Sequence, residues 1–224
     1  MEPRMEDIEQ LMSYIKELKE QLGDAYEEIH YIRDVMESMQ DNTLKVKLEK
    51  CIASAGEQIK EAKTACQNMK DRVYRDIGNA VQNAKTQGIR AVDKAVDIVH
   101  VRSALETIRN CLGKAADSLG KGMQRLDLAQ KEADAIKKHI GNFTRAIAGK
   151  SEDMPRQSSD KGVILRLHHC LSFCKRQVKG LEKKTLNALD AVDHLHQLTV
   201  SKEQNPTIVH EKEKTPELRM PKQR

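Results

Sequence analysis

The sequence predicts an all-α protein, in which long helices with heptad seams form an antiparallel helical bundle preceded by an N-terminal coiled coil. First, 33% of the residues are charged and 3% are aromatic, with no Trp, which is typical of long amphipathic helices rather than of a thick core. Second, residues 4–154 contain no proline that would interrupt a helix. Third, apolar residues recur alternately three and four positions apart, which is the period of a helix and not of a strand.

Residues 1–41 predict an acidic coiled-coil helix. Ten positions from Ile8 to Met39 follow the alternating spacing, and all ten are apolar. A straight helix drifts by about 20° per heptad from such a repeat, so the pattern requires a partner helix. Either a second copy of the chain or other helices of the same chain would cover it. The candidate association seam consists of Ile8, Leu11, Ile15, Leu18, Leu22, Ile29 and Ile32.

Residues 43–149 predict a central hairpin of two long helices. The stretch "DNTL" at positions 41–44 offers side-chain oxygens that can cap the first helix, whose apolar stripe runs from Leu48 to Val73. The second helix carries the longest pattern of the chain, from residue 101 to residue 147, with thirteen of fourteen seam positions apolar.

The stretch "SLGKGM" is the weakest point of that second helix. Gly122 occupies a seam position and Gly120 lies two residues before it. Each glycine costs about 1 kcal/mol relative to alanine in a helix interior. The helix therefore either continues through these glycines or kinks there.

Three further segments complete the predicted organisation. Residues 150–161 are polar and contain a proline, which indicates a linker. Residues 162–198 predict a C-terminal helix that packs on the bundle, because its apolar stripe keeps the alternating spacing. Residues 199–224 are charged and contain three prolines, and we expect a disordered tail.

Charge is divided unevenly along the chain. Residues 1–41 carry 4 Lys/Arg against 12 Asp/Glu, a net of −8, whereas the remainder is basic and brings the whole chain to +5. Attraction between the acidic and basic parts can act within one chain or between chains.

The start of the chain lacks the apolar core of a secretion signal, and no apolar run reaches the roughly 18 residues of a membrane span. We therefore expect a cytoplasmic protein that does not enter membranes, with its five cysteines reduced.

The stretch "LHHCLSFC" at 167–174 places two histidines and two cysteines within seven positions. On a helix, Cys174 belongs to the apolar seam and Cys170 flanks it, while His168 and His169 diverge from both. A tetrahedral zinc site needs four converging ligands, usually as two separated pairs. We therefore expect a core thiol and surface imidazoles here, and no metal.

The same helix carries a candidate basic face, formed by Lys175, Arg176, Lys179, Lys183 and Lys184. Such a face could bind phosphates without sequence preference, or it could contact the acidic N-terminal segment.

The sequence contains none of the phosphate-binding, metalloprotease or nucleophile-elbow motifs that would indicate catalysis. We expect a non-enzymatic helical interaction or scaffold protein without a cofactor or small-molecule substrate, with sequence-independent nucleic-acid binding as the alternative.

Two stretches, "DIVHVRSALETIRNCL" at 97–112 and "IGNFTRAIAGK" at 140–150, resemble an uncharacterised family of helical bacterial proteins from conjugative and integrative mobile elements. The family commonly has aromatic residues before the His and a proline shortly after it, whereas this chain has Ile98, Val99 and Ser103. The resemblance covers roughly residues 40–195 and assigns no active site. It implies an accessory protein of a mobile element.

Overall fold

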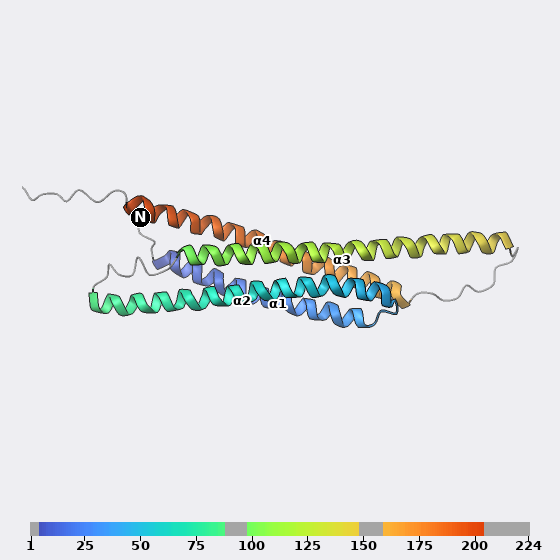
Figure 1. The fold of residues 1–224 in the computed structure, drawn as a ribbon, viewed down its shortest axis with the longest axis horizontal. Helices are drawn as coiled ribbons and strands as arrows, with labels where there is room; N and C mark the ends of the chain where they lie inside the picture. The colour runs from blue at the N-terminus through green and yellow to red at the C-terminus, as the bar shows by residue number, and fades with distance from the viewer. Residues whose placement is uncertain (1–4, 88–97, 148–158, 204–224) are drawn as a thin grey trace, which may run out of the picture.

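The computed structural model describes residues 5–87, 98–147 and 159–203, and these residues form four helices and no strand. The helices run alternately up and down the long axis of the molecule (Figure 1). They are α1 (Met5–Glu37), α2 (Asn42–Gln87), α3 (Ile98–Ile147) and α4 (Ser159–Glu203). This confirms the all-α class and the helical bundle that the heptad spacing predicts.

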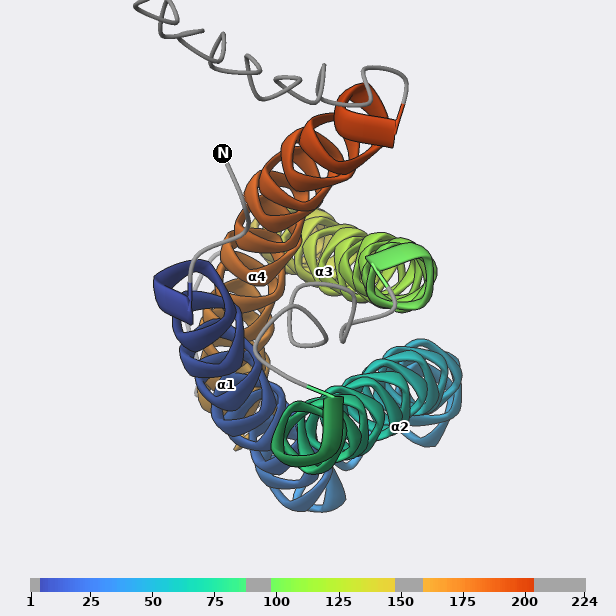
Figure 2. The same ribbon diagram turned by 90° about the vertical axis from the view of Figure 1, so that its left-hand side faces the viewer.

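The four helices close into a ring in which each contacts its two neighbours. α1 packs on α2, α2 on α3, α3 on α4, and α4 returns to α1, while among the described residues the Cα atoms of diagonal helices do not approach within 8 Å. Viewed along the bundle, α1 and α4 form one side of the ring and α2 and α3 the other (Figure 2). The acidic N-terminal helix is therefore one of the four members of the bundle.

Where the four helices lie beside one another, their seam positions point into the ring and form a single core. Full burial of each such aliphatic side chain stabilises the fold by about 1.5–3 kcal/mol. The largest side chains buried to below 2% exposure are Ile15, Leu18, Leu22, Ile29, Ile32, Leu48, Ile52, Ile59, Leu105, Ile108, Leu112 and Leu119.

The turn between α1 and α2 uses the capping chemistry that the sequence offers. Asp41 Oδ1 accepts hydrogen bonds from the backbone N–H groups of Thr43, at 2.9 Å, and Leu44, at 3.0 Å. It thereby satisfies two donors that have no partner inside the first turn of a helix. Lys45 Nζ donates to the backbone oxygen of Glu37 at 3.4 Å, which places a positive charge at the C-terminal end of α1.

α3 runs without interruption through both glycines. Gly122 is buried, and a Cβ at this position would lie 3.5 Å from Leu171 Cδ1 and 3.7 Å from Cys51 Cβ. Side chains of α2 and α4 therefore lie at ordinary contact distance from this position, and α3 packs between them there despite the low helix propensity of glycine.

The predicted linker and tail lie mostly outside the described residues. α4 begins at Ser159 and ends at Glu203, so it extends three residues before and five beyond the helix predicted for 162–198. Residues 148–158 and 204–224 are not described.

Candidate interaction surfaces

The candidate association seam of α1 is covered by helices of the same chain. Its members Ile15, Leu18 and Leu22 are at most 1% exposed, and Ile29 and Ile32 are fully buried. Leu11 is half-buried against the core, and the side chain of Ile8 lies outside the described part. Because α1 contacts α2 and α4, these helices occupy the position that the heptad pattern assigns to a partner.

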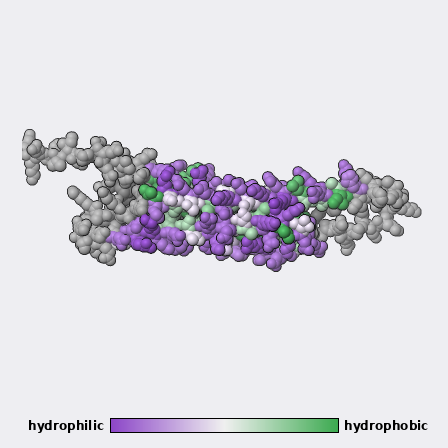
Figure 3. Space-filling model, in the orientation of Figure 1, coloured by the Kyte–Doolittle hydropathy of each residue, from purple (hydrophilic) through white to green (hydrophobic). Residues whose placement is uncertain are grey.

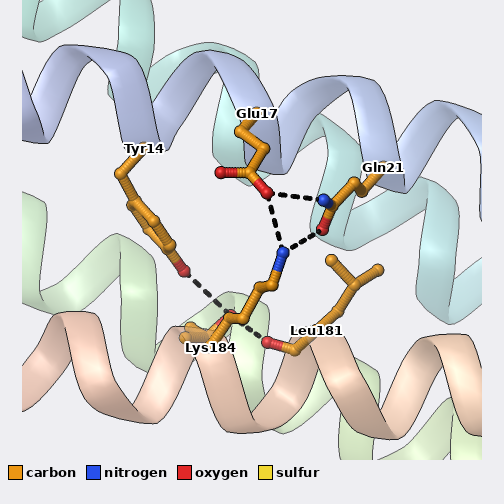
Figure 4. Close-up of polar contacts among 6 residues, drawn as sticks. Tyr14, Glu17, Gln21, Leu181 and Lys184 are labelled. Atoms are coloured by element: carbon orange, nitrogen blue, oxygen red, sulfur yellow. Dashed lines mark hydrogen bonds and ion pairs between the residues drawn. The ribbon is translucent and has the colours of Figure 1, made fainter.

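A polar contact fixes α1 beside α4 at the edge of this core (Figure 4). Tyr14 of α1 donates its hydroxyl hydrogen to Thr185 Oγ1 of α4 at 3.4 Å, and Thr185 donates to the backbone oxygen of Leu181 at 2.8 Å. Thr185 is fully buried and is the one polar residue buried as a whole among the described residues. Burial also raises the pKa of Tyr14 above its usual value, so the phenol stays protonated and able to donate.

A second contact lies on the solvent side of the same pair of helices (Figure 4). Lys184 Nζ donates to Glu17 Oε1 at 2.7 Å and to Gln21 Oε1 at 3.3 Å, and Gln21 in turn donates to Glu17. The Lys184 ammonium lowers the pKa of the Glu17 carboxyl below its usual range. The acidic N-terminal helix and the basic C-terminal helix are therefore joined within one chain.

The five cations of the candidate basic face do not form one free surface. Lys184 binds Glu17, and Lys179 binds Glu182 on its own helix at 2.8 Å, which raises the pKa of Lys179. Lys175 is half-buried, with its ammonium 2.9 Å from the point where a Cβ on Gly120 would lie. Arg176 and Lys183 are exposed and make no ion pair with the described residues.

The "LHHCLSFC" stretch divides between core and surface. Cys174 is fully buried, and burial raises its pKa to about 12, whereas Cys170 is half-buried. His168 Nε2 lies 3.3 Å from Asp127 Oδ1 of α3, and His169 is exposed. Nowhere among the described residues do three His, Cys, Asp or Glu side chains gather closely enough to hold a metal ion.

The end of α3 carries an apolar seam that no helix of the described bundle covers. The seam is buried from Val101 to Leu126, but Ala129 is half-buried, Ala133 is exposed and Ile136 is 55% exposed. The helix extends well past the ends of α1, α2 and α4 (Figure 1), and an apolar patch appears where it leaves the bundle (Figure 3). Sequence reasoning detects the continuing seam but not its exposure, because the exposure depends on where the other three helices end.

No helix in the described ranges combines the length and the apolar character needed to cross a membrane. No curated protein and no solved structure matches the chain. A model of a protein family matches residues 1–223, which is nearly the whole length. With its four-helix ring and heptad seams, the chain therefore belongs to the family of unknown function DUF6674.

Proposed function

We propose that the protein is a non-enzymatic helical interaction protein whose projecting α3 end presents a docking seam to a partner helix. The observation that carries the proposal is the change in burial along one continuous seam, from 1% at Leu126 to 55% at Ile136. An apolar heptad stripe that has no covering helix favours association with another amphipathic helix. In the sequence the same spacing continues through Phe143 and Ile147.

Photo-crosslinking in the host cell tests this function. A photoreactive residue in place of Ile136 should give a discrete adduct with one partner protein, because this position lies on the exposed seam. The matched control replaces Lys131, which is exposed on the same projecting end but lies outside the seam. Adducts from Lys131 as abundant as those from Ile136, or none from either position, would argue against the proposal.

The resemblance of residues 97–150 to proteins of conjugative and integrative elements supports an accessory role in such an element. Deleting the gene from an element that carries it should then lower the frequency of transfer, and the Ile136→Lys variant should restore transfer less well than the original gene. Transfer that is unchanged by the deletion would remove this part of the proposal.

Nucleic-acid binding is the weaker alternative. Arg176 and Lys183 are exposed and form no ion pair with the part of the chain that the structure describes, and this observation favours it. The exposed carboxylates of α1 lie beside them, however, and Glu17 already neutralises Lys184. A strand that follows α4 would meet these carboxylates within the Debye length of about 8 Å, where repulsion is not screened.

A further inference from the structure

The outer surface of α1 is a row of carboxylates. Glu20, Glu27 and Asp34 recur at intervals of seven residues and are all exposed, so they share the side of the helix that lies away from the core. Glu17 and Asp24 lie on the shoulder facing α4, because Glu17 contacts Lys184 and Asp24 follows it by seven residues. These five residues, which we name the acidic strip, are Glu17, Glu20, Asp24, Glu27 and Asp34.

The neighbouring outer surface of α4 is basic. Arg176 and Lys183 are seven residues apart and exposed, so they share the outward side of the helix. Arg166 and Lys184 lie on the shoulder facing α1, because Arg166 donates to the Tyr31 hydroxyl at 2.6 Å and Lys184 binds Glu17. These four residues, which we name the basic strip, are Arg166, Arg176, Lys183 and Lys184.

No carboxylate interrupts the basic strip. Glu182 is the one acidic residue between positions 162 and 189, and it is turned towards α3, since its Oε1 lies 3.4 Å from the Cβ position of Gly113. Among the α1 cations, Arg33 is turned away from α4, with its guanidinium 3.5 Å from the Cβ position of Gly56 on α2. The acidic strip lies on α1 and the basic strip on α4, the two helices that form one side of the ring (Figure 2).

Most of these charges have no ion-pair partner among the residues that the structure describes. The Glu17–Lys184 pair is the one ion pair that the described residues form between the two strips. Glu20, Asp24, Glu27, Asp34, Arg176 and Lys183 form no ion pair with the described residues. Two aromatic side chains are also exposed on the adjoining shoulders of α1 and α4, Tyr31 at 41% and Phe173 at 45%.

We propose that two copies of the chain associate face to face through these strips, related by a two-fold axis parallel to the bundle. This axis exchanges α1 and α4 across the interface, so each acidic strip meets the partner's basic strip. It also keeps every residue at its own level along the bundle. A two-fold axis across the helices would instead place acidic strip on acidic strip, which electrostatics opposes.

The register of α1 and α4 aligns the opposite charges in such a dimer. Glu17 is level with Lys184, and Tyr31 is level with Arg166, as their contacts show. Asp34 follows Tyr31 by three residues, so the partner's Arg166 meets Asp34. The partner's Arg176, which lies between those two levels, meets the middle of the acidic strip.

The same layout distinguishes a second copy from other occupants of this surface. Neighbouring helix axes lie about 8–10 Å apart, so a nucleic-acid backbone on the basic strip would also approach five carboxylates. A uniformly acidic protein surface would meet the same repulsion. A second copy presents one strip of each sign in the required arrangement. Burial of Tyr31 and Phe173 adds apolar contact area to ion pairs that are individually weak at an exposed surface.

Complementary charge reversal on the full chain tests the dimer. One variant carries Arg176→Glu and Lys183→Glu, which leaves Arg166 and Lys184 and makes the face mostly acidic, and the other carries Glu20→Lys and Glu27→Lys, which makes it mostly basic. All four positions are exposed, so both variants should keep the circular dichroism spectrum and the melting temperature close to those of the unmodified chain. Sedimentation velocity should show a dimer for the unmodified chain at low salt, a monomer for each variant alone, and a heterodimer for their equimolar mixture.

The matched control carries Lys50→Glu and Arg75→Glu on α2, which changes the net charge as much as the first variant does. Both positions are exposed, and α2 lies diagonally across the ring from α4 and carries neither strip, so this variant should still dimerise. A monomeric unmodified chain, a dimer that survives both reversals, or a mixture that stays monomeric would overturn the proposal. Retention of duplex DNA through Arg176 and Lys183 by a monomeric chain would assign the basic strip to nucleic acid instead. None of these outcomes depends on the crosslinking at Ile136.

Discussion

At the scale of single residues, the packing around two buried glycines determines what each position tolerates. Gly122 has room for a methyl group at ordinary contact distance from Leu171 and Cys51. A Cβ on Gly56 would lie 3.0 Å from Ile29 Cγ2, and Ile29 is fully buried. Glycine is a poor helix former at either position, but the sequence does not show how closely the neighbours approach, because they come from other helices.

The Gly122→Ala variant should increase the free energy of unfolding by about 1 kcal/mol, because alanine removes the helix-propensity cost without displacing a neighbour. In the comparison variant Gly56→Ala, the free energy of unfolding should rise by less or should fall, because overpacking a core typically costs about 1–3 kcal/mol. Urea unfolding of both variants measures the difference. Equal gains at the two positions would show that the packing around them does not matter.

Buried thiols make the bundle sensitive to alkaline pH. Burial raises the pKa of Cys66 to about 11 and that of Cys174 to about 12, and it also raises the pKa of Tyr14. An unfolded thiol ionises near pH 9, whereas the folded thiols keep their protons beyond that pH. The stability contributed by the protonated thiols is therefore complete below pH 9 and is lost as the pH rises towards 11–12.

The free energy of unfolding should accordingly fall above pH 9, with each thiol contributing up to about 1.4 kcal/mol per pH unit. Urea titrations at a series of pH values measure the slope. The Cys174→Ala variant should be less stable than the unmodified chain at pH 7. Its free energy of unfolding should fall less as the pH rises. A slope that Cys174→Ala and Cys66→Ala both leave unchanged would assign the effect to other groups.

At the scale of helices, the sequence predicts well that each of these segments is helical, because its apolar seam repeats over many turns. The stretch "DNTL" also indicates where α2 starts, because a capping side chain acts on the adjacent backbone; of its side chains, the structure uses Asp41. The sequence does not show how far each helix extends relative to the helices that pack against it. The same seam is core at Leu126 and surface at Ile136, and that difference follows from where the other helices of the bundle end.

Substitutions on this one seam should therefore have unequal effects. Leu126→Ala should lower the free energy of unfolding by about 2–5 kcal/mol, because it removes buried methyl groups and leaves a cavity. Ile136→Ala should change it by less than about 0.5 kcal/mol, because the side chain is already 55% exposed. Thermal or urea unfolding distinguishes the two. A large loss at Ile136 would show that its surface is covered in the isolated protein.

At the scale of the whole molecule, the unequal charge along the sequence corresponds to a spatial arrangement. The negative N-terminal segment and the positive C-terminal helix become adjacent strips on one side of the ring, joined through Glu17 and Lys184. The charge totals predict the attraction between these segments. They do not predict that most of the charges on these strips face outward and form no ion pair with the described residues, because that depends on the rotation of each helix about its axis. The seam of α1 was an equally good candidate for packing within the chain or between chains, and the ring buries it within the chain.

The closure of the ring by α1 and α4 has a consequence for how the chain folds. Every other helix contact joins consecutive helices, whereas Tyr14 and Thr185 are 171 positions apart and Glu17 and Lys184 are 167 apart. The entropy cost of bringing two segments together grows with the length of chain between them. The consecutive hairpins should therefore assemble first and the α1–α4 edge last. The same edge is then the natural place for the native ring to open, and amide hydrogen exchange along α1 would report that opening directly.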